Sequence, residues 1–211
     1  MDKYDKDKRI GLMVDEWGTW FNEEPGTIRG HLYQQNSMRD AFVAALSLNI
    51  FNKYGDRIQM ANIAQLANVL QSMVLTKDDK MTLTPTYHVF EMYKAHQDAT
   101  HIPIDLTSDT REIRGRNINT VSASVSQKGD AVNLTLTNID LETDRKIVID
   151  LPNPKAKNVN GRILTSKNIT DHNTFEQPNL VKPEVFKDAK IRNGKLELTI
   201  PAKSILALEV Q

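Results

Sequence analysis

An apolar run near the start of the chain leads directly into two carboxylates. Ile10-Gly11-Leu12-Met13-Val14 is followed by Asp15-Glu16-Trp17-Gly18-Thr19-Trp20. Such a run predicts a strand buried on both faces, which delivers acid at the point where it reaches the surface. Because successive strand side chains point to opposite faces, Asp15 and Glu16 cannot face one pocket in the same way. We expect one of the two carboxylates to take part directly in the chemistry and the other to support it by orienting its surroundings.

Both tryptophans of the chain, Trp17 and Trp20, flank this acid. Sugars stack their apolar faces on aromatic rings while carboxylates and amides bind their hydroxyls, so the pattern is compatible with a carbohydrate site that uses Glu16. In the structural alternative, Glu16 is a salt-bridged acid at a strand end and the tryptophans belong to the core. Residue types and spacing leave both interpretations open.

A parallel barrel is the fold that positions acids in this way, because its working residues lie at the carboxyl ends of the strands. Ser37 is predicted to cap a helix, with Asp40 three residues later as a variant of the capping box. Gly55 is predicted to end that helix in the left-handed conformation. The helix presents one apolar face, formed by Met38, Ala41, Phe42, Ala45, Leu48 and Phe51.

The alternation of strand and helix continues after Gly55. Residues 57–61 are predicted to form a strand, and Asn62 to cap a second helix over residues 63–74. Thr84 and Pro85 open a third helix, which ends near His96. This order favours parallel βαβ architecture with right-handed crossovers.

From about Thr100 the pattern changes to short, alternating segments rich in β-branched residues, which predict an antiparallel sandwich or jelly roll. Hairpin turns are predicted at residues 128–130 and 193–194, and a further tight turn between antiparallel strands at residues 201–203. Residues 166–188 are predicted to be irregular. The predicted strands are 121–127, 131–137, 145–151, 162–164, 195–200 and 204–210.

Composition excludes several classes of protein. Lys plus Arg and Asp plus Glu both number 27, so charge gives no reason to expect a nucleic-acid or anionic-membrane partner. No apolar run approaches the roughly 20 residues of a membrane helix. The absence of cysteine excludes disulfides and thiolate metal sites. The five histidines, which show no metal-ligand spacing with acidic partners, are His31, His88, His96, His101 and His172.

Four stretches carry a resemblance that covers essentially the whole chain. They are residues 10–20 (IGLMVDEWGTW), 33–41 (YQQNSMRDA), 61–66 (ANIAQL) and 87–90 (YHVF). The chain resembles the C-terminal part of the α-L-arabinofuranosidases of glycoside hydrolase family 51, and the Asp-Glu-Trp block is the most specific part of the match. The resemblance implies the last two strands and helices of a (β/α)8 barrel in residues 1–97, followed by the antiparallel sandwich in residues 98–211.

The resemblance also implies roles for individual residues. Glu16 matches the catalytic nucleophile of a retaining exo-acting glycosidase, and Gln65 matches a residue whose amide binds the hydroxyls of arabinose. Trp17 and Trp20 are candidate sugar contacts. The acid/base glutamate of the family follows an asparagine at the end of the fourth strand, before the stretch represented here, and we do not expect Asn22-Glu23 in a loop to replace it. The 211 residues are therefore expected to be inactive alone.

No cofactor is expected, and the implied partner is an oligo- or polysaccharide that carries arabinofuranosyl groups. Homo-oligomers are common in the family, and no pattern here decides the oligomeric state. The alternative hypothesis is a non-catalytic carbohydrate-binding or structural module formed by the sandwich. Its few aromatic residues, chiefly Phe175 and Phe186, provide no obvious stacking surface for a glycan.

Overall fold

The computed structural model describes residues 1–211, and its first half contains both α-helices of the molecule. Neither helix is long and apolar enough to cross a membrane. The elements of this half are β1 (Leu12–Trp17), α1 (Met38–Lys53), β2 (Ile58–Ile63), β3 (Val74–Lys77), β4 (Lys80–Leu83), α2 (Pro85–Tyr93) and a 3₁₀ turn (Lys94–His96). The second half consists of β5 (Thr100–His101), β6 (Thr110–Ile113), β7 (Arg116–Asn119), β8 (Val121–Lys128), β9 (Ala131–Asn138), β10 (Arg145–Asp150), β11 (Val159–Thr165), β12 (Glu184–Phe186), β13 (Ala189–Arg192), β14 (Lys195–Ile200) and β15 (Ser204–Val210).

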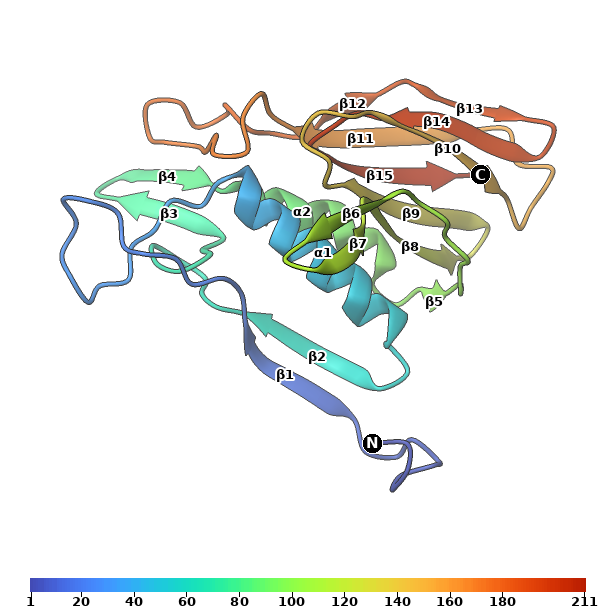
Figure 1. Cartoon of the computed structure of the whole chain (residues 1–211), viewed down its shortest axis with the longest axis horizontal. Coiled ribbons are helices and arrows are strands. Elements are labelled where there is room, and N and C mark those ends of the chain that lie inside the picture. Colours follow the sequence, from blue (N-terminus) through green and yellow to red (C-terminus); the bar gives the residue numbers. More distant parts are fainter.

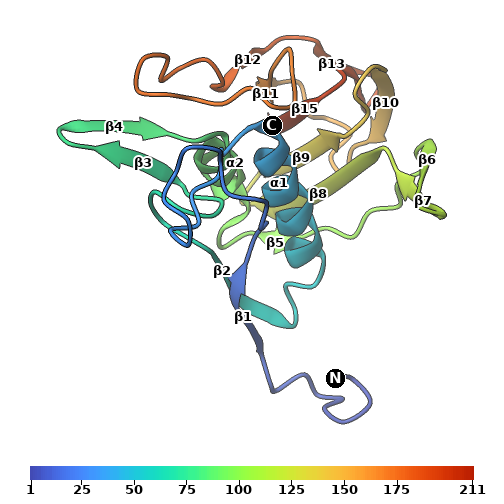
Figure 2. The same cartoon turned by 60° about the vertical axis from the view of Figure 1, so that its left-hand side comes forward.

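The elements are arranged in layers (Figure 1). β1 and β2 form a parallel pair on one side of α1 and α2. On the other side of the helices lies a six-stranded sheet in the order β12-β11-β15-β9-β8-β5, and a three-stranded sheet, β10-β14-β13, packs on the outer face of that sheet. The view in Figure 2 likewise places α1 between β1–β2 and the sandwich. The predicted domain boundary between residues 97 and 98 stays a prediction. An apolar cluster that contains residues from both sides of this boundary joins the helices to the six-stranded sheet.

The start of α1 agrees with the sequence, but its end does not. The Ser37 backbone N–H donates to Asp40 Oδ2 over 2.8 Å, which confirms the capping box. The expectation that Gly55 ends the helix in the left-handed region was wrong: Tyr54 is the C-cap, and Gly55 does not have a positive φ. Backbone bonds from Arg57 and Ile58 to the Tyr54 carbonyl turn the chain directly into β2.

The helix predicted for residues 63–74 was also wrong. Two amides, Met73 N–H and Val74 N–H, donate to the Leu66 carbonyl, and Asn68 and Gln71 have positive φ values of 66° and 45°. The apolar spacing here did not mark a buried face, since Leu66 is 73% exposed. The segment is a compact loop that leads into the β3–β4 hairpin, where Asp78 has a φ of 54°.

The predicted sandwich is confirmed, and most of its strands lie within one or two residues of their predicted bounds. β8 and β9 form the hairpin predicted at residues 128–130, and β13 and β14 the one at 193–194. Asn193 and Gly194 have φ values of 51° and 74°, as a two-residue hairpin turn with a left-handed backbone requires. The core between the two sheets consists mainly of valine and leucine side chains from β8, β9, β14 and β15.

Three features of the sandwich differ from expectation. The turn at residues 201–203 does not join paired strands, because β14 belongs to the three-stranded sheet and β15 to the six-stranded sheet. Residues 166–188 are irregular except for β12, which pairs with β11. The β6–β7 hairpin was not predicted. The two residues of its turn, Arg114 and Gly115, have φ values of 51° and 74°, as a two-residue hairpin turn requires, and glycine is a residue that such turns favour.

The prediction that the first strand is buried on both faces was wrong for the molecule formed by these residues. Leu12 is 40% exposed and Met13 49% exposed. β1 pairs only with β2, so one edge has no hydrogen-bonded neighbour and one face has no covering layer. β1 also extends through Trp17, so that Asp15 and Glu16 lie within it.

Candidate active site

Glu16 and Gln65 lie at the same end of the parallel β1–β2 pair. Glu16 is the next-to-last residue of β1, and Gln65 follows β2 by two residues. Trp17 pairs with Ile63, and the Ala64 N–H donates to the Trp17 carbonyl over 2.9 Å. Because the carboxyl ends of parallel strands lie at the same edge of a sheet, the backbone segments that carry Glu16 and Gln65 lie side by side. Both side chains are exposed, as groups that meet a substrate must be.

The two tryptophans have different surroundings. The Trp17 ring packs edge-on against Phe51 at 5.2 Å and stacks with Phe90 at 5.9 Å between centroids. It therefore packs against the apolar cluster beneath β1, as the structural alternative for this residue expected. Trp20 is 69% exposed in the loop that follows β1. Of the two rings, Trp20 has the free surface that sugar stacking needs.

A buried polar network lies under the loops that leave β1 and β2. Gln71 is fully buried, and its side-chain carbonyl accepts from the Thr19 N–H and lies 2.8 Å from the Thr19 hydroxyl. Its amide group donates to the Asp40 backbone carbonyl over 2.7 Å. The Asp40 carboxylate, also fully buried, accepts from Ser37 and lies 3.0 Å from the Thr19 hydroxyl. Three segments of the chain thus meet in one hydrogen-bonded cluster.

The loop between β1 and α1 is held by its own carboxylates. Glu23 accepts from the Gly30 and Leu32 backbone amides over 2.7 and 2.9 Å. The Arg39 guanidinium lies 3.5 Å from the centroid of the Phe21 ring, which fastens the loop to α1. Glu23 therefore braces the loop, and this role accounts for a carboxylate at that position without acid/base chemistry.

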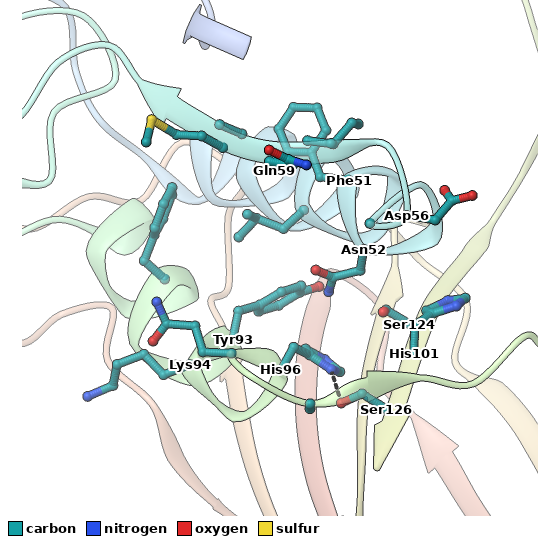
Figure 3. Close-up of a pocket in the computed structure, with 18 of the residues that line it drawn as sticks. Phe51, Asn52, Asp56, Gln59, Tyr93, Lys94, His96, His101, Ser124 and Ser126 are labelled. Carbon is teal, nitrogen blue, oxygen red and sulfur yellow. Dashed lines mark hydrogen bonds between the residues drawn. The ribbon is translucent and has the colours of Figure 1, made fainter. Parts of the chain in front are cut away.

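A cavity of about 790 Å³ is lined by parts of α1, β2, α2 and β8 (Figure 3). Glu16, Gln65 and Trp20 are not among its lining residues. At its floor, His96 Nδ1 lies 2.7 Å from the Ser126 hydroxyl, and Nε2 lies 3.0 Å from that of Thr135. Burial lowers the pKa of His96 to about 4, so the ring is neutral at pH 7.

The polar face of β9 is buried rather than exposed to solvent. Asn49 of α1 accepts through Oδ1 from the hydroxyls of Tyr93 and Thr135, both over 3.0 Å. Burial raises the pKa of Tyr93 to about 12, which keeps its phenol protonated as a donor. These contacts attach the helices to the sheet and suit a structural role. No group of three or more His, Asp or Glu side chains is placed to hold a metal ion.

Sequence reasoning proposed Glu16, and the resemblance proposed Gln65, but neither pointed to Gln71. The pattern assigned Gln71 to a helix, and its partners Thr19 and Asp40 lie 52 and 31 positions away in the sequence. Asp40 was recognised only as a helix cap. The left-handed φ of Gln71 and its complete burial cannot be seen in the apolar spacing on which the helix was predicted.

The chain is similar over its whole length to curated proteins. It is 58% identical over 213 residues to the intracellular exo-alpha-L-arabinofuranosidase of Bacteroides ovatus, an alignment that covers 100% of this chain and 41% of the relative. It is 25% identical to the exo-alpha-(1->6)-L-arabinofuranosidase of Bifidobacterium longum, covering 96% of this chain and 42% of that protein. The chain therefore spans about two fifths of the length of each of these two relatives.

Solved structures of arabinofuranosidases are also similar to the chain over nearly its whole length. The GH51 arabinofuranosidase from Xanthomonas axonopodis pv. citri superposes with a TM-score of 0.96 at 44% identity, covering 100% of this chain and 43% of that one. The alpha-L-arabinofuranosidase of Thermotoga maritima, at 22% identity and a TM-score of 0.82 over 99% of this chain and 44% of that one, shows the shared fold. The family model described as alpha-L-arabinofuranosidase C-terminal domain matches residues 15–204, and the chain belongs to this family.

Proposed function

We propose that these residues form the C-terminal part of a retaining, exo-acting α-L-arabinofuranosidase in which Glu16 is the nucleophile. The observation that carries the proposal is the exposed Glu16 carboxylate at the carboxyl end of β1, beside the segment that carries Gln65. Family membership and similarity to an exo-alpha-L-arabinofuranosidase support this activity for a full-length protein that contains the chain. The substrate is a glycan with terminal arabinofuranosyl groups, such as arabinan or arabinoxylan.

In the proposed mechanism, a Glu16 oxygen attacks the anomeric carbon and the glycosidic bond breaks through an oxocarbenium-like transition state. A second carboxyl group protonates the departing oxygen and then activates the water that releases arabinose. The Gln65 amide binds the hydroxyls of the sugar, and the exposed Trp20 ring offers a stacking surface. Trp17, which packs on Phe51 and Phe90, holds β1 against the helices.

We propose that the second carboxyl group lies in a part of the full-length protein outside these 211 residues, as the resemblance implies. Glu23, the nearest alternative in the loop, already accepts two backbone amides. We therefore propose that the 211-residue polypeptide alone does not release arabinose. Turnover of an aryl arabinofuranoside by the purified polypeptide would contradict this proposal.

The nucleophile is tested in a full-length protein that contains this chain. Glu16→Ala is expected to abolish turnover of an activated aryl arabinofuranoside, and added azide should restore it with formation of the inverted glycosyl azide, because azide replaces the missing nucleophile. Glu23→Gln is the matched control, a carboxylate-to-amide change in the adjacent loop, and should retain most activity. Near wild-type turnover of Glu16→Ala would refute the assignment.

A carbohydrate-binding module finds less support in the structure. The exposed aromatic side chains are Tyr4, Trp20 and Tyr54, and all of them precede the sandwich. A sandwich that binds glycans by stacking would present such rings on its own surface.

A further inference from the structure

The loops that leave β1 and β2 depend on one side chain for their relative position. Gln71 comes from the loop after β2, and its carbonyl oxygen accepts from the Thr19 N–H in the loop after β1. Its amide nitrogen donates to the Asp40 carbonyl in the first turn of α1. One fully buried amide thus joins the segment of Glu16 and Trp20 to the segment of Gln65 and to the helix.

The backbone at this junction leaves little freedom. Gly18, between Trp17 and Thr19, has a φ of 149°, a region that favours glycine. A Cβ there would lie 3.2 Å from the Ala64 carbonyl oxygen and 3.3 Å from Gln71 Oε1. The exit of β1 therefore passes directly over the Gln71 amide. On the other side of Gln71, the Gln65 N–H donates to the Leu70 carbonyl over 2.8 Å.

We infer that Gln71 is a positioning residue for the reaction of Glu16. It does not touch substrate; it sets the distance and angle between the Glu16 carboxylate, the Trp20 ring and the Gln65 amide. Retaining hydrolysis needs the attacking oxygen in line with the departing bond, and displacement by about 1 Å can lower a rate on the order of 100-fold. This inference rests on the proposed function, because it gives Gln71 a role only where Glu16 is the nucleophile.

The first test replaces the amide by a side chain of similar length that has no hydrogen-bond donor and only a weak acceptor, in the full-length protein. Gln71→Met should lower kcat/KM for an activated aryl arabinofuranoside on the order of 10- to 100-fold, at a temperature where circular dichroism shows the variant folded. This constant reports formation of the glycosyl-enzyme, which is the step that Glu16 performs. A value within about twofold of wild type overturns the inference.

Asn138 provides a matched control in the sandwich. It is equally buried, and its amide donates to the carbonyls of Thr143, Ile200 and Pro201. Asn138→Leu should lower the melting temperature and leave kcat/KM within about twofold of wild type. An equal loss of kcat/KM in both variants means that Gln71 acts only through general stability, which overturns the inference.

Gln71→Glu adds a signature that a purely structural role would not produce. The new carboxylate keeps the acceptor for Thr19 but opposes the Asp40 carbonyl, and protonation restores a donor. The ratio of variant to wild-type kcat/KM should therefore rise as pH falls from about 7 to 5, since burial raises the pKa of such a carboxyl group. A ratio that does not change with pH overturns the inference, whether or not Gln71→Met folds.

Glu16→Gln separates the inference from the proposed function. If that variant is inactive and Gln71→Met remains fully active, only the positioning role fails. If Glu16→Gln is as active as wild type, the proposed function itself fails.

Discussion

β15 and β1 are short strands dominated by apolar residues, yet they differ in almost every physical respect. β15 pairs on both edges, with β11 and β9, and both of its faces are covered. β1 pairs on one edge only, and its Leu12 and Met13 side chains are among the exposed large hydrophobic residues. An apolar pattern therefore indicates that a strand is suited to burial, whereas the elements packed around the strand determine whether it is buried.

Truncating one apolar side chain in each strand should give the largest contrast. Leu206 of β15 is fully buried in the sandwich core, so Leu206→Ala should lower the free energy of unfolding by about 2–5 kcal/mol. Met13 of β1 is 49% exposed, so Met13→Ala should change it by less than about 0.5 kcal/mol. Urea denaturation of the 211-residue polypeptide measures both values. A comparable loss from Met13→Ala would show that β1 is buried in solution, for example by self-association through its open edge.

Glycines in the two regions offer a second, smaller contrast. A Cβ at Gly161 of β11 would lie 2.8 Å from Leu208 Cδ2 and 3.0 Å from the Phe186 carbonyl oxygen, neither of which can move freely. Gly161→Ala should therefore lower the free energy of unfolding by about 1–3 kcal/mol. The atoms nearest to a Cβ at Gly11 all belong to the end of the Gln59 side chain, which can rotate away. Thermal unfolding should show little change for Gly11→Ala, and an equal loss at both sites would contradict the contrast.

The contact between the helices and the six-stranded sheet is expected to depend on pH. The pKa of His96 is about 4 in the folded chain against 6.5 for a free side chain, because the ring is buried. Between these values only the unfolded state takes up the proton, so stability should fall as pH decreases from 6.5 towards 4, by on the order of 1–3 kcal/mol.

Urea denaturation from pH 7 to pH 4.5 should show a smaller loss for His96→Gln than for wild type. His88, whose pKa is also lowered by burial, acts in the same direction and remains in both proteins, so only the difference between the two proteins is informative. Identical pH dependence in the two would exclude His96 as its source.

The smallest global effect is expected at the N-terminal segment. Arg57 donates to the carboxylates of Asp5 and Asp2, each over 2.6 Å, and to the Ile10 carbonyl over 2.9 Å. Arg57→Ala should release residues 1–10 from the turn that precedes β2 and speed tryptic cleavage at Lys6 and Lys8, while the melting of the sandwich stays unchanged. Arg192→Ala, which removes an exposed ion pair with Glu197 on the sandwich, is the control and should not alter cleavage in this segment. Unchanged cleavage in Arg57→Ala would show that other contacts hold the segment.

The sandwich was predictable because its signals are local. β14 and β15 begin and end where the alternation of side chains and the flanking turn residues place them. The segment 63–74 was not predictable in this way, because buried bonds from Gln71 to residues far away in the sequence outweigh its helical spacing. The polar alternation of β9 would equally suit a solvent-facing surface, and only the packing of Asn49 and His96 against it shows otherwise.

The candidate site likewise contains some residues that the sequence points to and others whose roles depend on the tertiary fold. A strand end and a carboxylate point to Glu16 from sequence alone, and the resemblance adds Gln65. The difference between Trp17 and Trp20 depends on which face of β1 the helices cover, and that follows from the tertiary fold. The role of Gln71 could not be predicted, since it exists only where three distant segments meet.

The central position of β15 has a consequence for the order of synthesis. β15 (residues 204–210) pairs with both β9 and β11. During synthesis on a ribosome, the two parts of the six-stranded sheet therefore cannot be joined until β15 has been made. Until then the apolar sides of β9 and α1 remain without their partners Leu206 and Ile205. A nascent chain arrested before residue 204 should therefore be a good substrate for chaperones and proteases, and acquire resistance only when this strand has emerged.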